Sequence, residues 1–155
     1  MKRSIPFDTS VLISLGHTDL ISKILDNYTP IVTYSIISEL QEIAGRDDPD
    51  GDSAKKWLKE KHRFQIEKVK KQSPTEDELF LISIVRKLPI VTDDIKAVKR
   101  YRKKCRCLFS VHIIYSLFLK EKISRARGKL AIQKMRVVRS WKSNAISTAA
   151  EILFE

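Results

Sequence analysis

The sequence predicts an α/β fold in which helices cover a mostly parallel β-sheet. Two observations support this. Five short β-like runs alternate with helical patterns along the 155 residues, and such alternation is typical of layered folds with a parallel sheet. No internal repeat, low-complexity tract or Gly/Ser-rich linker interrupts the order. Because this length corresponds to about one domain, we expect a single domain over 1–155, with about 121–155 as a C-terminal helical extension packed on it.

Each element is placed by its hydrophobic pattern. The predicted strands are Ser4–Phe7, Ile31–Thr33, Phe64–Lys68, Ile90–Thr92 and Cys107–Phe109. The predicted helices occupy about residues 10–26, 35–44, 53–62, 75–88, 95–104, 111–122, 125–138 and 143–153. In a parallel sheet, ligands bind beyond the carboxyl ends of the strands, where the turns into the helices converge. Residues directly after each strand are therefore the first candidates for a functional site.

The composition argues against several classes of protein. No stretch approaches the roughly 20 apolar residues of a membrane span, and Asp8 precedes any signal-peptide core, so we expect a cytoplasmic protein without a membrane partner. The four glycines form no phosphate-binding loop. The three histidines lie outside the acidic positions considered below, which leaves no Ser-His-Asp or Cys-His mechanism in view. Cys105 and Cys107 lie one residue apart on one β-like run, without the geometry for an easy disulfide.

The net charge of +11 is concentrated in the C-terminal part of the chain. Residues 1–94 hold 14 Lys/Arg and 16 Asp/Glu, a net of −2, whereas residues 95–155 hold 16 Lys/Arg and 3 Asp/Glu, a net of +13. A solvated surface would mix both signs, so the asymmetry indicates a polyanionic partner. Nucleic acid is favoured over an anionic membrane because no strongly apolar amphipathic face accompanies the densest basic run.

Asp8 closes the first predicted strand and precedes a helical pattern. An aspartate at that point can act as the N-cap of the helix. The same position, at the carboxyl end of a strand, is where an active-site acid would lie. The residues alone leave both interpretations open.

Glu39 lies at the edge of the apolar face of the predicted helix 35–44. At about 100° per residue, Glu39 falls about 40° from Ile43, whereas Glu42 falls nearly opposite the apolar face. Glu39 can therefore point along the surface into a cleft, although a glutamate that extends into solvent fits the position as well. We expect Glu42 to face solvent.

Three consecutive acids, Glu76, Asp77 and Glu78, precede a strongly apolar helix. Ser73, as N-cap, would form a capping box with Glu76, which gives Glu76 a structural role. By helical geometry Asp77 and Glu78 project toward the apolar side. Asp77 is the first candidate for a functional acid, and Glu78 is the alternative.

Asp93 and Asp94 end the fourth predicted strand side by side. One of them can cap the following helix. Two adjacent carboxylates repel each other unless a cation or a polar site accepts them, so the pair favours a functional site.

In their order along the chain, these acids resemble those of the PIN-domain family of prokaryotic nucleases. That family carries an Asp-Thr/Ser-Ser opening, a Glu in an early helix, an acid at the start of a buried helix and a Thr-x-Asp that closes the next strand. In this chain the four elements read Phe7-Asp8-Thr9-Ser10-Val11-Leu12-Ile13, Ser38-Glu39-Leu40, Asp77-Glu78-Leu79-Phe80-Leu81 and Val91-Thr92-Asp93-Asp94. The resemblance covers about residues 4–120.

The resemblance implies a Rossmann-like three-layer fold with a mostly parallel five-stranded sheet flanked by helices, and a ribonuclease that uses Mg²⁺ or Mn²⁺ to hydrolyse single-stranded RNA. The catalytic residues that it implies are Asp8, Glu39, Asp77 and Asp94. The implied metal ligands are Asp8, Asp77, Asp93 and Asp94, and the supporting residues are Thr9, Ser10, Thr92 and Glu78. Many members are toxins, which makes a small antitoxin protein a possible partner. We also expect a homodimer, the commonest soluble oligomer.

The predicted helix 95–104 directly follows the Asp pair and is strongly basic. It can supply phosphate contacts beside the acids, and the nucleic-acid-binding residues that we predict are Lys96, Lys99, Arg100 and Lys103. Tyr101 in the same helix could stack on a base or face the core, and the sequence leaves both possibilities open.

Two other functions compete with the nuclease. One is a catalytically inactive PIN-like RNA-binding or scaffold protein, which metal-dependent cleavage of RNA would distinguish from an enzyme. The other is a receiver-type signalling domain, whose acids also lie at strand ends. The receiver domain is disfavoured because Ser110 and Val111 follow the last predicted strand where such a domain needs a lysine, and because it does not explain Glu39.

Overall fold

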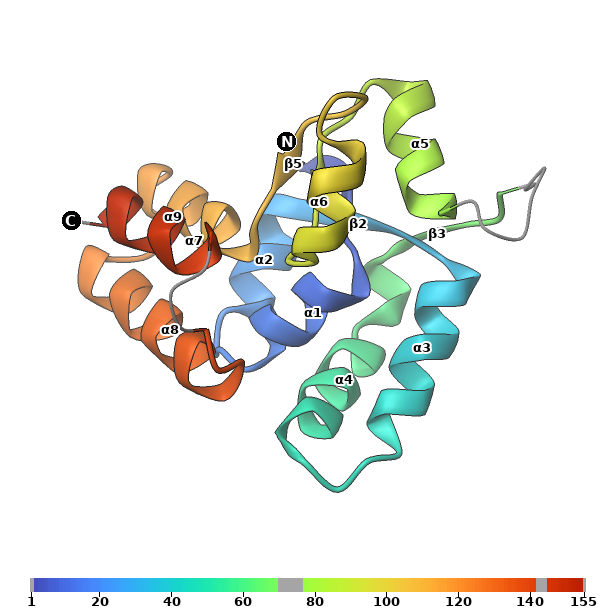
Figure 1. Cartoon of the computed structure of the whole chain (residues 1–155). Helices are drawn as coiled ribbons and strands as arrows, with labels where there is room; N and C mark the ends of the chain where they lie inside the picture. The colour runs from blue at the N-terminus through green and yellow to red at the C-terminus, as the bar shows by residue number, and fades with distance from the viewer. Residues whose placement is uncertain (1, 70–76, 142–144, 155) are drawn as a thin grey trace.

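The computed structural model describes residues 2–69, 77–141 and 145–154 (Figure 1). Within these ranges the chain forms five β-strands, nine α-helices and one 3-10 turn. The strands are β1 (Arg3–Pro6), β2 (Tyr28–Thr33), β3 (Gln65–Glu67), β4 (Ile90–Val91) and β5 (Cys107–Leu108). The helices are α1 (Thr9–Gly16), α2 (Ile21–Asn27), α3 (Tyr34–Ala44), α4 (Pro49–Lys59), α5 (Glu78–Arg86), α6 (Ile95–Tyr101), α7 (Ser110–Leu119), α8 (Arg125–Val138) and α9 (Ala145–Phe154), with the turn η1 at Lys61–Arg63.

All strand pairs are parallel, as the alternating pattern predicts, but the strands form two sheets. One sheet has the order β1-β2-β3 and the other pairs β4 with β5. A single parallel bridge between Phe7 and Val91 joins them, and the backbone N–H of Asp8 donates to the carbonyl of Val91 at 2.9 Å. The expectation of one five-stranded sheet is thus met only in part, because β4 and β5 are two residues long in the described structure.

The helices surround the strands in three groups. Figure 1 shows α5 and α6 at the top, α3 and α4 at the lower right, and α7, α8 and α9 at the left. Helix α5 packs against β1, β2 and β4, while α2 packs against β2 and α7. Helices α3 and α4 pack on each other, and α4 also packs on α1. At the α1–α4 contact Gly16 is required, because a Cβ there would lie 1.9 Å from Ser53 Oγ.

Several helix boundaries differ from the sequence prediction, three of them for reasons that local hydrogen bonds explain. The predicted helix 10–26 is two helices, because the Thr18 hydroxyl donates to the Leu15 carbonyl and accepts from the Leu20 N–H, which ends α1 and redirects the chain. Helix α4 begins at Pro49 instead of about 53, since Asp48 accepts a hydrogen bond from the Gly51 N–H and acts as its N-cap. Helix α5 begins at Glu78 instead of about 75, and Asp77 is its N-cap.

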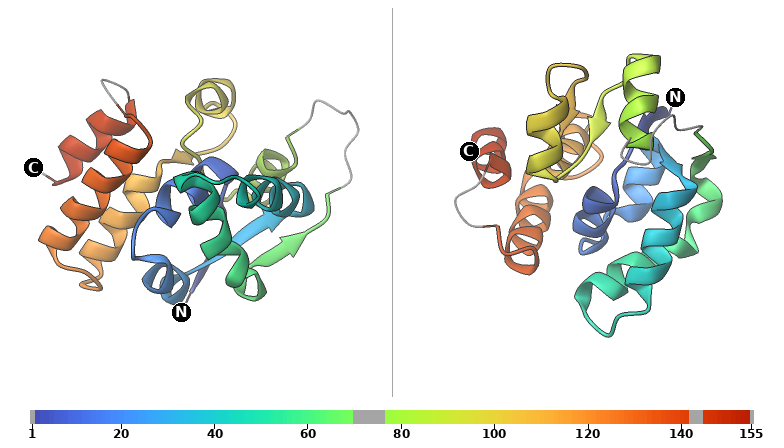
Figure 2. Two further views of the ribbon diagram at one scale, coloured as in Figure 1. Left: turned by 90° about the horizontal axis from the view of Figure 1, so that it is seen from below. Right: turned by 45° about the vertical axis from the view of Figure 1, so that its right-hand side comes forward.

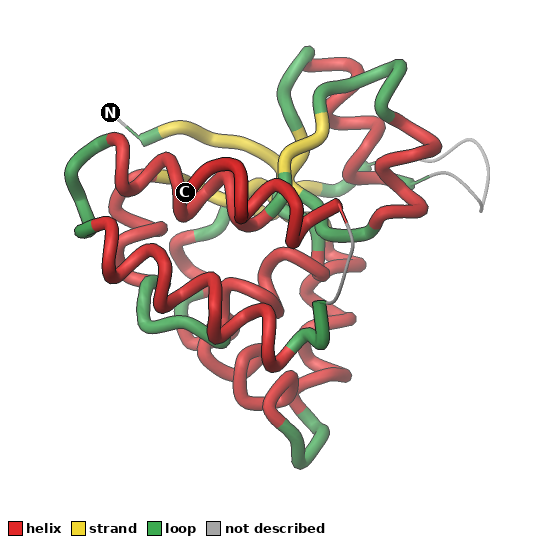
Figure 3. The backbone as a smooth tube through the Cα atoms, turned by 60° about the vertical axis from the view of Figure 1, so that its left-hand side comes forward, coloured by secondary structure: helices red, strands yellow, loops and turns green. Residues whose placement is uncertain are grey.

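The C-terminal helices share the hydrophobic core of the rest of the chain. Figures 2 and 3 show α8 and α9 side by side, and both pack on α7. Phe154, 5% exposed, lies against Tyr115 and Phe118 at ring-centroid distances of 5.4 Å and 6.0 Å. On the other side, Asp50 accepts from Arg139 at 3.3 Å and bonds His17 at 2.9 Å, which ties α8 to α4 and α1. Helices α8 and α9 are therefore docked onto the body of the molecule.

None of the helices in the described ranges has the length and apolar character that crossing a membrane requires.

Candidate active site

Asp8 lies where β1 ends and α1 begins. It occupies the N-cap position of α1, yet its side chain makes no capping hydrogen bond. Instead its Oδ2 accepts from the hydroxyls of Ser10 and Thr92, each at 2.9 Å. The carboxylate is therefore turned from its own helix toward the end of β4. The sequence left helix capping and a functional role open for Asp8, and the side chain of Asp8 does not cap α1.

The pKa of Asp8 is perturbed by its surroundings. Burial raises the pKa of Asp8 above its ordinary value of 3.8, the hydrogen bonds from Ser10 and Thr92 oppose that rise, and the nearby charge of Asp77 adds to it. Within the part of the chain that the structure describes, no ion pair includes Asp8. Asp8 is thus a desolvated carboxylate whose charged neighbour is another acid.

The adjacent acids Asp93 and Asp94 differ in burial and in hydrogen-bond partners. Asp94 is exposed, and its Oδ1 accepts from the N–H groups of Lys96 and Ala97, which makes it the N-cap of α6. Asp93 is buried, and its two oxygens accept from the N–H and the hydroxyl of Ser110 at 2.9 Å and 2.6 Å. Burial raises the pKa of Asp93, and the bonds from Ser110 oppose the rise.

Of the two arrangements that the sequence allowed for the Asp pair, a polar site for Asp93 is present in the structure. Because both oxygens of Asp93 face Ser110, this residue does not have the place expected of a metal ligand. Ser110 was missed as a partner in the sequence, where a serine after a short strand carries no signal of its own. Asp94 keeps the position next to the site, since its backbone N–H donates to Thr92 Oγ1 at 3.1 Å.

Glu39 reaches the Asp8 segment from α3. Its Oε2 accepts from the Thr9 hydroxyl at 2.7 Å, although the side chain is largely exposed. Thr9 is the residue directly after Asp8, so this bond connects Glu39 to the segment that carries Asp8. The sequence left open whether Glu39 points along the surface or into solvent, and the exposed side chain makes this one contact. Glu42 is exposed, in agreement with its expected position.

Asp77 and Glu78, at the start of α5, form different hydrogen bonds. Asp77 Oδ1 accepts from the N–H groups of Leu79 and Phe80 and caps α5, while its charge acts on Asp8. Glu78 Oε1 instead accepts from the Ser35 hydroxyl at the start of α3, at 3.0 Å. The charge that acts on Asp8 therefore comes from Asp77, the first candidate of the sequence. The predicted capping box of Ser73 and Glu76 lies outside the described residues.

The side chains of Asp8, Ser10 and Thr92 join the strand ends into one network. Ser10 Oγ lies 3.4 Å from Thr92 Oγ1 and accepts from the Asp93 N–H at 3.0 Å, so three hydrogen bonds of this network cross from the β1 end to the β4 end. All the side-chain donors to a metal here would be oxygens, which suits Mg²⁺ or Mn²⁺. Over residues 2–69, 77–141 and 145–154, however, no three His, Cys, Asp or Glu side chains form a group that could hold a metal ion. The predicted cluster of four carboxylates is therefore not assembled among these residues.

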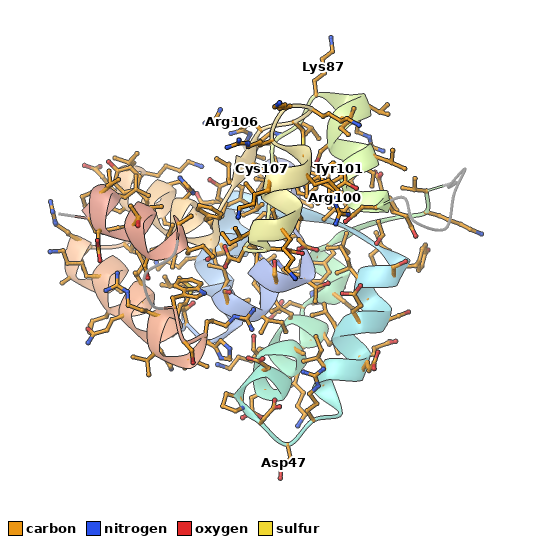
Figure 4. The ribbon with its side chains drawn as sticks, in the orientation of Figure 1. Asp47, Lys87, Arg100, Tyr101, Arg106 and Cys107 are labelled. Atoms are coloured by element: carbon orange, nitrogen blue, oxygen red, sulfur yellow. The ribbon has the colours of Figure 1, made fainter. Side chains whose placement is uncertain are left out.

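Helix α6 presents its predicted basic residues to solvent directly after Asp94. Lys96, Lys99, Arg100 and Lys103 are all exposed. Tyr101 stacks on Phe80 of α5 with ring centroids 3.9 Å apart and an interplanar angle of 17°, and Figure 4 shows it between α6 and α5. Of the two possibilities for Tyr101, packing against the protein is thus the one observed.

Comparisons with protein-family models, with curated proteins and with solved structures found no match to this chain. The predicted RNA, antitoxin and homodimer partners therefore stay predictions from the sequence.

Proposed function

We propose that this protein is a metal-dependent ribonuclease that hydrolyses phosphodiester bonds of single-stranded RNA, with Asp8 as its central acid. The observation that carries the proposal is the surroundings of Asp8. Its carboxylate does not cap the helix that it precedes, is held by Ser10 and Thr92, and has Asp77 as its charged neighbour. A bound cation would make the ionised form of such a carboxylate favourable.

The place of Asp8 in the chain topology supports the same function. We propose that the five strands act as one sheet in the order β3-β2-β1-β4-β5, joined at the bridge between Phe7 and Val91. In this order the chain first runs outward from β1 and then crosses to the other side at β4. Ligands of parallel sheets bind beyond the carboxyl ends of the strands at such a reversal. Thr92 directly follows β4, and Asp8 follows the bridging residue Phe7 after β1.

The residues at this point fit a hard divalent cation in donor type. Asp8, Asp77 and Asp94 do not form a metal-binding group in this structure, so they would have to come closer together to hold Mg²⁺ or Mn²⁺. The ion would supply an activated water and stabilise charge on the leaving oxygen. Ser10 and Thr92 hold the Asp8 carboxylate in place. Glu39, held by the Thr9 hydroxyl, offers an acceptor for a proton of the attacking water. Asp93 anchors α7 through Ser110 and is not among the proposed ligands.

Helix α6 supports RNA as the substrate. Because Asp94 caps α6, this basic helix begins at the acidic site and can hold phosphates of an RNA strand beside it. Lys96 lies at its start, and Lys99, Arg100 and Lys103 follow along or just after it. These side chains offset the repulsion between the acids and an RNA backbone.

The decisive experiment compares Asp8→Asn with the wild-type chain in cleavage of unstructured RNA with Mn²⁺. We expect at least about a 100-fold loss of cleavage, since the ligand charge is removed, and no loss of thermal stability. Asp47→Asn is the matched control, because Asp47 is exposed at the loop between α3 and α4, away from the site (Figure 4). Absence of cleavage by the wild-type chain over varied RNAs, with no metal-induced rise in melting temperature, would leave an RNA-binding or scaffold protein.

A second experiment tests the RNA contacts. Reversing the charges of Lys99, Arg100 and Lys103 to Glu should weaken binding of single-stranded RNA and reduce the slope of log affinity against log salt concentration by about 0.7 or more per lost phosphate contact. Lys134→Glu on α8 is the control for a change of net charge. An unchanged salt slope in the triple variant would assign the basic residues of α6 to solubility.

A further inference from the structure

A basic cavity lies at the amino ends of the strands, opposite the end that carries Asp8. Its volume is about 340 Å³, and its lining includes Arg3 at the start of β1, Lys87 after α5, and Lys104 and Arg106 before β5. Figure 4 shows Lys87 and Arg106 at the same end of the molecule, with Asp47 at the far end. About five residues of extended chain, or roughly 16 Å, separate Arg3 from Asp8. The cavity is therefore distinct from the candidate active site.

The charges of the cavity are not balanced by acids. No Asp or Glu lines it, and none of its four cationic residues forms an ion pair with an acid of the described chain. Four like charges around one cavity repel each other unless an anion lies between them. The carboxyl ends of α5 and α6 approach this region, and their partial negative charges explain why cations gather here.

The partial charges of the helix ends do not explain the buried hydroxyl group of Ser83. It lies within α5, is fully buried and lines the cavity. Its Oγ has no hydrogen-bond partner among the described residues, although a serine within a helix ordinarily donates to the carbonyl of the preceding turn. A buried hydroxyl without a partner lowers stability. Its position in a cavity lined by cations indicates a group that accepts a hydrogen bond.

We propose that this cavity binds the phosphate group of a phosphate monoester or of inorganic phosphate. Such a group carries close to two negative charges at neutral pH and has three strong acceptor oxygens. The guanidinium groups of Arg3 and Arg106 match these oxygens in pairs, and the Ser83 hydroxyl supplies a further donor. A phosphodiester of an RNA backbone carries only one charge, which four cations fit less well. The cavity volume lies at the lower end of the range for small-molecule sites.

The test is a calorimetric titration of the full chain at low salt with inorganic phosphate and with a nucleoside 5′-monophosphate. We expect saturable binding by the wild-type chain, about tenfold or more weaker binding by Arg106→Gln, and about three- to tenfold weaker binding by Ser83→Ala. Ser83→Ala should melt at or above the wild-type temperature, because it removes an unpartnered hydroxyl and places a better helix former. Lys134→Gln, an exposed control on α8, should bind like wild type.

The source of the phosphate group is resolved by a short oligoribonucleotide with a 5′-phosphate and its twin with a 5′-hydroxyl. The phosphorylated oligonucleotide should compete with the nucleotide, and its twin should compete about tenfold less well. Equal competition would assign the cavity to the RNA backbone and overturn the proposal. So would the absence of saturable phosphate binding, or equal affinity in Arg106→Gln and Lys134→Gln. None of these measurements uses cleavage, so their outcome is independent of the proposed function.

Discussion

The two ends of β1 and β4 differ in charge and in hydrogen bonding. At the carboxyl ends, Asp8, Ser10 and Thr92 bond to one another, and no ion pair of the described chain includes Asp8. At the amino ends, four cations surround a buried serine hydroxyl that has no partner among the described residues. Arg3 and Lys87 belong to the part of the chain that is net acidic by sequence. The residues at the two ends of these strands therefore differ in charge, although the basic helix α6 begins beside the acidic end.

The largest expected effect is the loss of stability caused by Asp93→Ala at the acidic end. This change leaves the buried N–H and hydroxyl of Ser110 without their acceptor, so we expect a loss of about 2–4 kcal/mol in the free energy of unfolding. Asp94→Ala removes only the exposed cap of α6 and should cost about 1 kcal/mol. Urea unfolding of both variants measures the difference. Equal losses would mean that the two aspartates are equivalent.

At the basic end, Cys107 should react slowly in spite of its cationic neighbourhood. Burial raises the pKa of Cys107 from 9.0 to about 11, with further contributions from Cys105. Two units of pKa correspond to about 100-fold less thiolate at neutral pH, and the thiolate is the reactive form. A Cys105→Ser variant isolates Cys107 but removes the smaller contributions of Cys105 to its pKa. Alkylation of the native variant should therefore be slower than that of the chain unfolded in urea by a factor that approaches but does not exceed about 100. An alkylation rate of the native chain within a few fold of that of the unfolded chain would show that the nearby cations offset the effect of burial on the pKa of Cys107.

Asp8→Asn should raise stability at neutral pH and lose that advantage in acid. The raised pKa of Asp8 means that its charged form destabilises the fold, and that protonation, as pH falls through the folded pKa toward 3.8, relieves the cost. A gain of about 1 kcal/mol would appear as a rise of roughly 2–4 °C in melting temperature for a chain of this size. Melting curves from pH 4 to 8 test this. A difference from wild type that does not shrink toward pH 4 would contradict the assignment.

The smallest expected effect is that of Lys87→Gly at the basic end. Lys87 ends α5 with φ 54° and ψ 41°, a left-handed conformation that glycine adopts at less cost. We expect a gain of about 0.5–1 kcal/mol in stability, together with weaker phosphate binding because a cation is lost. Thermal melting and the phosphate titration measure the two changes. If stability and binding fall together, Lys87 holds the local fold instead of serving a ligand.

Much of the fold could be predicted because its signals are local. The order of strands and helices follows from apolar runs that alternate with helical patterns, and the described strands lie within two or three residues of their predicted ends. The break between α1 and α2 was missed because it depends on the hydroxyl of Thr18 bonding within its own turn. The division into two sheets was missed because the short pairings of β4 with β5 and of Phe7 with Val91 are long-range.

The sequence by itself determined that acids follow β1 and β4. The position of a strand along the chain, and of the polar residues after it, is indicated by short segments of sequence. Only the tertiary structure decided what each acid does. Asp93 and Asp94 are chemically the same and adjacent, yet successive side chains after a strand point to opposite faces, so one meets Ser110 and the other solvent at the start of α6. Asp8 meets Thr92 because two strands far apart in sequence are paired. The identity of an aspartate does not indicate its hydrogen-bond partner, because tertiary packing brings that partner from a distant part of the chain.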